Sequence, residues 1–376
     1  MKHRNLLAVL LTAPLLVAPT CMQQLLGARI EFHPESMFVL SPDGSTAIGS
    51  VWKGSSVGTV VWKNGVVVEL PIPLWLQDTS YDGRVIVGYT GGDHPARWKD
   101  GELTVLWPVA GESRAKGVSW DGEVVVGIAD DPNLPASGVM WLGDSLIPLT
   151  TEDGFRADSA IAVSADGEVI LGLGEDADGN SGRYLWRAGE ITWVAGLPGA
   201  DPRDRSYVYM SISGDGTTVV DEDRFPLPGP DGELRRAFRW RDGIAEPLGS
   251  LEGAPQPSSN ASAVTANGEV IVGDAMGPDG YPIAMIWDPT HGMRSLESLL
   301  LELGVEVPEG KRLYSVDGIS SDGRRILGSV YPGFYETFIV TLPPACADRL
   351  DNDGDGDTDF PHDRGCDSHF DESEDS

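Results

Sequence analysis

The sequence predicts an all-β fold, a seven-bladed β-propeller, from three observations. A pattern of an apolar residue followed by Ser-x-Asp-Gly, with a second Gly five residues after the first, recurs seven times along the chain, with small departures in the second, fifth and sixth copies. A Trp follows the pattern in six of the seven copies. Gly is frequent, at 47 of 376 residues, and the apolar runs are short. Short apolar runs between Gly-containing turns indicate an all-β domain, and repeats of this length match propeller blades.

Each repeat places Asp-Gly or Asn-Gly between two apolar runs. This is a strong signal for a β-hairpin, because these residues tolerate the positive φ angles of primed turns. We expect the repeated Asp side chains to cap the turns by hydrogen bonds to the backbone, which argues against paired catalytic carboxylates. The fifth copy has Asp221 where the second Gly should stand. The turns lie at Asp43-Gly44, Asp82-Gly83, Asp121-Gly122, Asp166-Gly167, Asp215-Gly216, Asn267-Gly268 and Asp322-Gly323.

The segments after the turns predict the remaining strands. The run after each turn, such as Val124-Val125-Val126, is continuous and often β-branched, which indicates a strand buried on both faces. The Trp strand and the turn that follows it predict a second hairpin, so each repeat supplies about four strands. We expect the repeated Trp side chains to pack in the core or between blades; they are Trp62, Trp98, Trp141, Trp186, Trp240 and Trp287.

The ends of the repeat array predict how the ring closes. The seventh copy ends early at Leu342-Pro343-Pro344 and lacks an outer strand. The segment Arg29–His33 precedes the first repeat and is expected to supply that strand, because a closed ring leaves no open sheet edge. Leu296–Leu303 reads as a short helical insertion that Gly304 ends.

The repeats resemble the extracellular HAF repeat of bacterial proteins. The family pattern is Val-Ser-x-Asp-Gly-x-x-Val-Val-Gly followed by Ala-Phe-x-Trp, and Ala237-Phe238-Arg239-Trp240 matches its second half. The resemblance covers nearly all of residues 30–342. It implies a repeat β-architecture outside the cell and no common chemistry.

The N-terminus predicts export. A basic start at Lys2, His3 and Arg4 precedes an apolar stretch, Leu6–Ala18, that is too short to span a bilayer. Cys21 stands where bacterial lipoproteins carry their lipidated cysteine, although Pro19 and Thr20 depart from the usual motif. Lipidation at Cys21, ordinary cleavage with secretion, and an uncleaved anchor all remain open. The expected divisions are a signal peptide at 1–20, a linker at 21–28, the propeller at 29–345 and an acidic tail at 346–376.

The tail predicts a calcium site. It holds twelve acidic residues and two arginines, and seven of the acids lie between two cysteines. In an oxidising compartment Cys346 and Cys366 would form a disulfide. The spacing of the acids, with Gly356, fits a calcium loop without the final Glu of an EF-hand, and it resembles thrombospondin type 3 repeats and modules of exported myxobacterial proteins. The alternative is a disordered, solvated tail. The expected calcium ligands are Asp351, Asp353, Asp355, Asp357, Asp359 and Asp363.

The net charge and the motifs narrow the possible functions. A net charge of −31 disfavours nucleic acid as a partner. Gly54-Ser55-Ser56-Val57-Gly58 matches a nucleophile elbow in letters but lies between two expected strands, whereas that motif needs a following helix. The six His residues show no metal-ligand spacing. The aromatic residues outside the repeat pattern are the better ligand candidates: Trp107, Trp193, Tyr207 and Tyr209.

The sequence therefore predicts an exported, non-catalytic protein of a Gram-negative bacterium, secreted or held at the outer envelope, that binds or scaffolds an extracellular protein or glycan. Its only expected membrane contact is a lipid anchor. The alternative is an extracellular enzyme, a glycan lyase or hydrolase, with its site on one propeller face.

Overall fold

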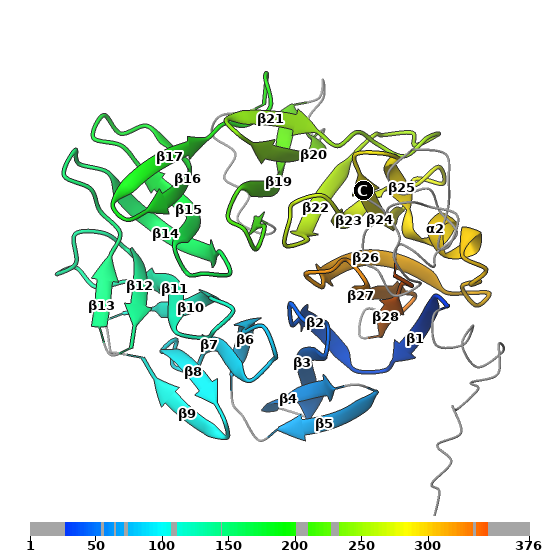
Figure 1. Ribbon diagram of the computed structural model, residues 1–376, viewed down its shortest axis with the longest axis horizontal. Helices are drawn as coiled ribbons and strands as arrows, with labels where there is room; N and C mark the ends of the chain where they lie inside the picture. The colour runs from blue at the N-terminus through cyan, green and yellow to red at the C-terminus, as the bar shows by residue number, and fades with distance from the viewer. Residues whose placement is uncertain are drawn as a thin grey trace, which may run out of the picture.

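The chain forms a closed ring of β-sheets. The computed structural model describes residues 27–53, 56–63, 65–70, 74–106, 111–143, 145–200, 210–226, 233–333 and 336–344. Within these ranges the strands form seven four-stranded antiparallel sheets around a central channel (Figure 1). The predicted seven-bladed β-propeller is confirmed.

Within blades 1 to 6 the strands follow chain order from the channel outward. The strands of blades 1 to 3 are β2 (Ser36–Leu40), β3 (Thr46–Lys53), β4 (Ser56–Lys63), β5 (Val66–Leu70), β6 (Trp75–Thr79), β7 (Val85–Tyr89), β8 (Pro95–Lys99), β9 (Glu102–Val105), β10 (Ser113–Val118), β11 (Val124–Ala129), β12 (Gly138–Leu142) and β13 (Ser145–Pro148). Those of blades 4 to 6 are β14 (Arg156–Val163), β15 (Val169–Glu175), β16 (Ser181–Arg187), β17 (Glu190–Val194), β18 (Ser211–Ile212), β19 (Thr218–Pro226), β20 (Glu233–Arg241), β21 (Ile244–Pro247), β22 (Ser259–Val264), β23 (Ile271–Met276), β24 (Pro282–Asp288) and β25 (Gly292–Ser295).

The seventh blade joins the two ends of the described chain. It contains β26 (Arg312–Ile319), β27 (Arg325–Tyr331), β28 (Thr337–Thr341) and, outermost, β1 (Arg29–His33). β1 pairs antiparallel with β28 from Arg29 opposite Thr341 to His33 opposite Thr337, and Figure 1 shows the two strands side by side. The predicted closure by the N-terminal segment is confirmed.

Thr337 links blade 7 to blade 1. Its side chain is buried, and its Oγ1 accepts a hydrogen bond from the Met37 backbone N–H at 2.9 Å. The same hydroxyl donates to the Glu35 carbonyl at 2.8 Å. This contact holds the entry of β2 against the last strand of the chain.

The substitution Thr337→Val is expected to destabilise the protein by about 1–3 kcal/mol, because it leaves the buried Met37 N–H without a partner. Urea unfolding of the purified protein measures this cost. The matched control is Thr341→Val on the same strand, where the buried hydroxyl has no hydrogen-bond partner among the described residues. That variant should be as stable as the wild type or more so, and equal losses in both variants would contradict this account of the closure.

The Ser-x-Asp-Gly turns show the predicted capping in a different turn geometry. In blade 1, Asp43 Oδ1 accepts hydrogen bonds from Ser41 Oγ at 2.6 Å and from the Ser45 N–H at 2.9 Å. Gly44 has a φ of +68°, but Asp43 is not among the residues with positive φ. The prediction of primed turns is therefore wrong here, since a type I′ turn needs positive φ at both central residues. It holds at three outer hairpins, where both turn residues have positive φ: Asp100-Gly101, Ala188-Gly189 and Asp242-Gly243.

The same turns join the blades in a closed belt. In each blade a backbone N–H at or just after the x position donates to the carbonyl of the x residue in the next blade. Seven such bonds, of 2.6–3.2 Å, run Asp43 to Tyr81, Tyr81 to Trp120, Trp120 to Ala165, Ala165 to Gly214, Asp215 to Ala266, Ala266 to Ser321 and Ser321 to Pro42. Asp43 donates in blade 1 because Pro42 has no N–H. The repeated motif thus holds neighbouring blades together at one end of the channel.

The hydrophobic core lies between blades. One cluster joins Met37 and Trp62 of blade 1 to Leu327 and Ile339 of blade 7. All six repeated Trp side chains are buried or half-buried, so their predicted packing role is confirmed. In β28, Val340 takes the equivalent place, opposite Ile326.

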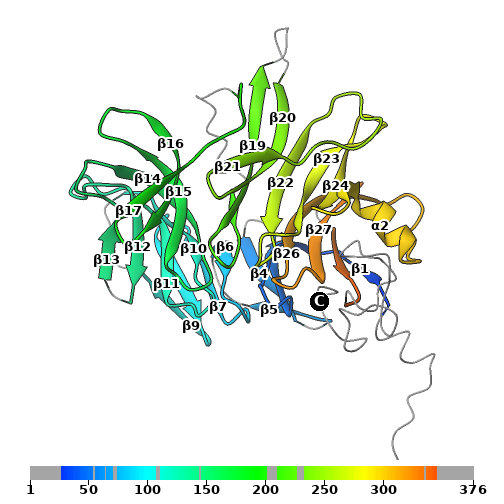
Figure 2. The same cartoon turned by 45° about the horizontal axis from the view of Figure 1, so that its top comes forward.

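One helix interrupts the pattern between blades 6 and 7. α2 (Leu296–Glu302) begins after Ser295, whose hydroxyl accepts the Ser298 N–H at 3.1 Å, and it confirms the predicted insertion. Leu296, Leu299 and Leu300 are buried against the core, and Figure 2 shows the helix at the rim of the ring beside β24. No helix in the described ranges is long and apolar enough to cross a membrane.

Candidate functional site in the central channel

A β-bulge recurs at the same place in the innermost strands. The register skips one residue in β2, β6, β10, β14, β22 and β26, three residues before the Ser or Thr of each turn. A bulge leaves its extra residue unpaired and redirects that side chain. β14 and β26 each skip a second residue closer to the start of the strand. The residues skipped at the shared place are Phe38, Gln77, Lys116, Ile161, Ser262 and Asp317. Met210 holds the corresponding place in blade 5, just before β18.

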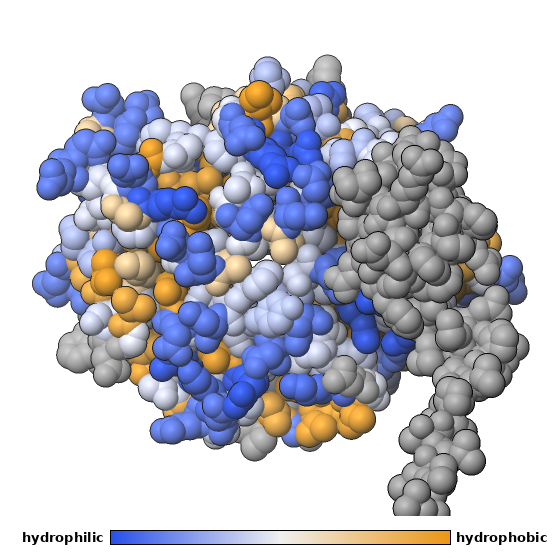
Figure 3. Space-filling model, in the orientation of Figure 1, coloured by the Kyte–Doolittle hydropathy of each residue, from blue (hydrophilic) through white to orange (hydrophobic). Residues whose placement is uncertain are grey.

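All seven of these side chains line one cavity in the centre of the ring, with a volume of about 710 Å³. Figure 3 shows the face hollowed at its centre, with residues of mostly intermediate hydropathy around the hollow. The backbone positions repeat, but the side chains are aromatic, amide, ammonium, aliphatic, thioether, hydroxyl and carboxylate. The repeat therefore supplies a uniform frame, and the chemical variation is presented to the channel.

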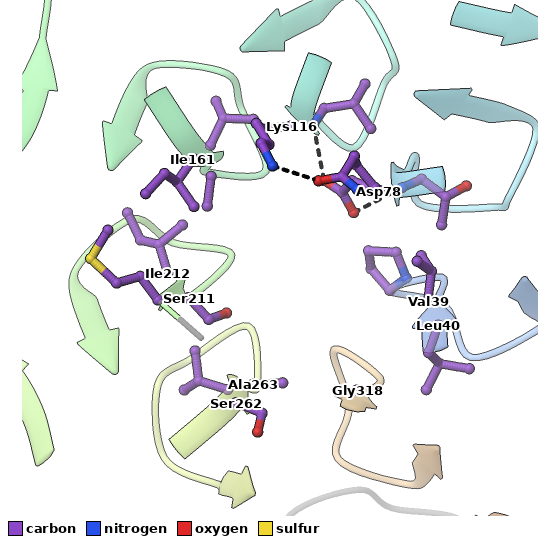
Figure 4. Close-up of a pocket in the computed structure, with 18 of the residues that line it drawn as sticks. Val39, Leu40, Asp78, Lys116, Ile161, Ser211, Ile212, Ser262, Ala263 and Gly318 are labelled. Atoms are coloured by element: carbon purple, nitrogen blue, oxygen red, sulfur yellow. Dashed lines mark hydrogen bonds between the residues drawn. The ribbon is translucent and has the colours of Figure 1, made fainter. Parts of the chain in front are cut away.

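One wall of the cavity is polar and spans blades 2 and 3 (Figure 4). Lys116 Nζ donates to Gln77 Oε1 at 2.9 Å. Asp78 joins the two blades, because its Oδ1 accepts the Thr79 N–H at 2.8 Å and its Oδ2 accepts the Val118 N–H at 2.9 Å. Burial raises the pKa of Asp78 to about 6, and it lowers the pKa of Lys116.

A second carboxylate enters the cavity from blade 7. Asp317 Oδ2 accepts a hydrogen bond from Ser329 Oγ at 3.2 Å, and no ion pair forms at Asp317 within the described residues. Burial raises the pKa of Asp317 to about 7, and the nearby Asp274 adds to the shift. Burial also raises the pKa of Asp274 itself to about 6. Asp158 lines the cavity as well and is engaged in another interaction.

The raised pKa of Asp317 predicts how stability depends on pH. An Asp whose pKa is higher in the folded than in the unfolded state binds more protons when folded, so stability falls as pH rises from about 4 to 7. The variant Asp317→Asn should show a shallower fall over this range. Thermal unfolding at several pH values measures it, with Asp131→Asn in an exposed loop as the control. Parallel curves for the wild type and Asp317→Asn would contradict the assignment.

Aromatic side chains border one mouth of the channel. Tyr81 and Trp120, at the x positions of blades 2 and 3, pack with ring centroids 4.9 Å apart. The Trp120 ring reaches as far as blade 5, since a Cβ built on Gly214 would lie 2.7 Å from it. Gly214 is therefore the side-chain-free position that admits this indole.

A buried ionic cluster replaces the glycine that the fifth repeat lacks. Asp221 is fully buried in β19, and its carboxylate pairs with Arg183 of β16 in blade 4. Arg183 also pairs with Asp223 at 2.9 Å and donates to the Glu222 carbonyl at 2.9 Å. This cluster joins blades 4 and 5, so its role is structural.

The other candidate residues from the sequence lie at separate places in the fold. Trp193 lies half-exposed on β17, beside a second cavity at the rim of blade 4. β17 is the outermost strand of that blade, whereas the channel is lined by the innermost strand, β14. His94 and His291 lie in loops between strands, as expected. β3 and β4 are antiparallel partners around the Gly-x-Ser-x-Gly sequence, so no helix follows it.

Several predicted sites lie outside the described residues. They are the signal segment, Cys21, Trp107, Tyr207, Tyr209, the Cys346–Cys366 pair and the six calcium-ligand aspartates of the tail. In the ranges that the structure describes, no group of three or more His, Cys, Asp or Glu side chains is arranged to hold a metal ion.

The candidate residues that sequence reasoning missed are the seven bulge positions. The repeat was recognised by what stays the same, namely Ser, Asp, Gly and Trp, whereas the channel is lined by what varies. The available signal was the single position in each repeat, three residues before the Ser or Thr, at which no residue type recurs.

Comparisons with known proteins bear on the fold alone. No protein-family model matches the chain, and no curated protein matches it in sequence. Among solved structures, hydrazine synthase of Kuenenia stuttgartiensis is 14% identical, covers 82% of this chain and 95% of its own, and has a TM-score of 0.49. A putative TolB of Agrobacterium tumefaciens is 14% identical and covers 85% and 99%, with a TM-score of 0.40. The β-propeller domain of the trilobed protease of Pyrococcus furiosus, described as having an open velcro topology, is 12% identical and covers 81% and 79%, with a TM-score of 0.40.

Proposed function

We propose that this protein is a non-catalytic binding or scaffold protein whose ligand, a group of an extracellular protein or glycan, enters the central channel. The observation that carries the proposal is the set of seven bulge positions. Their backbone geometry is repeated, yet their side chains differ and all face one cavity. Recognition of a specific ligand needs a rigid frame with a few placed polar groups among apolar ones.

The contacts of the polar residues support binding over turnover. Both Asp78 oxygens accept backbone N–H groups, one from Thr79 in its own blade and one from Val118 in blade 3, so this carboxylate is held in place as part of the wall. Lys116 is held by the Gln77 amide. No Ser, Thr or Tyr hydroxyl of the described channel lining is hydrogen-bonded to a His, which a Ser–His nucleophile would require.

A channel-filling variant tests the proposal. The substitution Ser262→Phe places a large side chain at a bulge position, as Phe38 does naturally in blade 1. A set of sugars, amino acids and short peptides would be screened for binding by ligand-observed NMR. Compounds that bind the wild type should lose binding to Ser262→Phe and keep it to Thr104→Phe, a matched change on the exposed outer strand β9. Unchanged binding to Ser262→Phe would contradict a channel site.

One observation favours the alternative of an extracellular glycan lyase or hydrolase. Asp78 and Asp317 line the same cavity, with pKa values raised by burial to about 6 and about 7. Carboxyl groups with raised pKa values serve as general acids in glycoside cleavage. Incubation with polysaccharides, followed by mass spectrometry of the products, distinguishes the two functions. Cleavage by the wild type that Asp317→Asn abolishes would replace the binding proposal with the enzymatic one.

The proposed location is the exterior or outer envelope of a Gram-negative bacterium, in line with the HAF-repeat resemblance. It rests on the basic and apolar N-terminus and on Cys21. Palmitate labelling with cell fractionation tests it. Label that depends on Cys21 indicates a lipoprotein, unlabelled protein in the medium indicates secretion, and protein retained in the cytoplasm would contradict export.

The acidic tail is proposed to bind calcium through the six aspartates named above. Hard oxygen ligands at this spacing suit calcium, with an expected affinity in the range of roughly 10⁻⁴–10⁻³ M for extracellular modules. Calorimetric titration of calcium into the full chain tests the proposal, with the variant Asp353→Asn/Asp355→Asn as the control. We expect binding that the double substitution weakens at least tenfold, and equal heats for both proteins would contradict a specific site.

A further inference from the structure

We propose that the channel binds a dipolar ligand, with its carboxylate at Lys116 and its ammonium group at Asp317. The inference rests on the proposed channel site and names the chemistry of its occupant. The ligand class is a chain with a free amine at one end and a free carboxylate at the other, as in an ω-amino acid or a short peptide.

The two charges lie on opposite sides of the same cavity. Lys116 belongs to β10 of blade 3 and Asp317 to β26 of blade 7, and three steps around a seven-membered ring is the largest separation possible. Figure 4 shows Lys116 at one edge of the cavity and Gly318, the neighbour of Asp317, at the other. Both residues occupy the bulge position that turns a side chain into the channel.

Neither charge has a counter-ion in the part of the chain that the structure describes. Among the described residues Lys116 forms no ion pair, and its hydrogen-bond partner is the neutral Gln77 amide. Asp317 is met by the neutral Ser329 hydroxyl. Burial shifts the pKa of each group towards its neutral form, so each charged form is poorly solvated in the free protein. A ligand that brings the opposite charge to each side relieves both penalties at once.

The other carboxylates are less suited to receive an ammonium group. Asp78 already accepts two backbone hydrogen bonds, and Asp158 already has an interaction partner. Phe38 holds the bulge position of blade 1, which is adjacent to the blade of Asp317. Its side chain is 36% exposed and offers an aromatic group to a cation. Ile161 and Met210, between Lys116 and Ser262 on the other arc, offer apolar contact to the methylene chain of a ligand.

The test is a length series of ω-amino acids, from γ-aminobutyrate upward, titrated calorimetrically into the full-length protein at about pH 8. For each chain length the diamine and the dicarboxylate serve as controls, since each carries one of the two charged ends twice. Peptides of matched length with free termini, and the same peptides with blocked termini, distinguish a peptide source from a free amino acid. We expect binding to peak at one chain length, with the amino acid bound more tightly than the diamine or the dicarboxylate.

Two variants then test which residue binds which end of the ligand. Lys116→Met and Asp317→Asn are each expected to lower the affinity for the best-binding amino acid by roughly tenfold to a hundredfold, the usual effect of losing a charge-assisted contact. The affinity for the diamine should not fall in Lys116→Met, and the affinity for the dicarboxylate should not fall in Asp317→Asn. Lys99→Met, which alters an exposed ion pair with Glu123, is the control and should bind as the wild type does.

Preferential binding of diamines, equal binding of all three series, or no binding by any member would overturn the inference. The wild-type selectivity alone decides this, even if a variant fails to fold. If Ser262→Phe still abolishes the binding of other compounds in the screen, only the dipolar inference fails. If Ser262→Phe leaves all binding intact, the channel proposal fails with it.

Discussion

Replacing Gly127 with alanine is expected to destabilise the propeller by about 3 kcal/mol or more. A Cβ at this position of β11 would lie 2.1 Å from the Arg114 carbonyl oxygen and 3.0 Å from the Ala115 Cα. Both neighbours are backbone atoms of β10, which cannot move without breaking the strand pairing. Gly127 stands opposite Ala115, the residue just before the bulge. Because Gly127 has no side chain, the bulged strand can approach its backbone closely.

Urea unfolding of Gly127→Ala against the wild type measures the loss. The control is Gly91→Ala, because nothing lies within 4 Å of a Cβ at Gly91 and its φ is not in the left-handed region. That change should be neutral or slightly stabilising. The same effect is expected at the other glycines that face a bulge, and a Gly127→Ala protein as stable as Gly91→Ala would contradict the packing that creates the channel.

The change Asp221→Gly should also be strongly destabilising, although it restores the residue found in the other six repeats. β18 is two residues long and pairs with Val220 and Val219, so its ladder does not extend to Asp221. The buried carboxylate instead pairs with Arg183, whose side chain is 12% exposed. Removing Asp221 breaks one of two buried ion pairs of Arg183 and leaves it Asp223 and the Glu222 carbonyl, so we expect a loss of about 2–3 kcal/mol.

A double-mutant cycle checks the reason for this loss. Arg183→Met should be destabilising on its own, and Asp221→Gly should cost much less in the Arg183→Met background, because the Asp221–Arg183 ion pair is then already absent. Stability is measured by urea unfolding for all four proteins. Additive losses, or a more stable Asp221→Gly protein, would contradict the role assigned to the pair.

Local residue chemistry made most of the fold predictable. The turn sequences and the continuous apolar runs located the blades, and the early end at Pro343-Pro344 located the missing strand that β1 supplies. The turn type was predicted wrongly because Asp-Gly alone does not reveal its loop length. In the Ser-x-Asp-Gly turns the Ser41 N–H reaches the Thr46 carbonyl, so the loop is longer than two residues.

The channel could not be predicted in the same way. A bulge depends on how two strands pair, and no residue type marks it, so Gln77 and Lys116 look like ordinary polar residues in the sequence. The belt of hydrogen bonds between x residues depends on the ring having closed, since each bond joins residues about forty or more positions apart. The buried pair of Asp221 and Arg183 likewise joins two blades. These features arise from tertiary geometry and become visible only with the ring assembled.

Methyl NMR of the bound protein tests the central claim most directly. Isoleucine and methionine methyl groups would be labelled, and a compound selected in the screen of sugars, amino acids and short peptides would be added to the full chain. Ile161, Met210 and Ile212 line the channel, whereas Ile244 lies exposed on the outer strand β21. A channel ligand is expected to shift the first three signals and leave that of Ile244 in place. A shift at Ile244 with unchanged channel signals would contradict the account and place the binding surface on the outside of the ring.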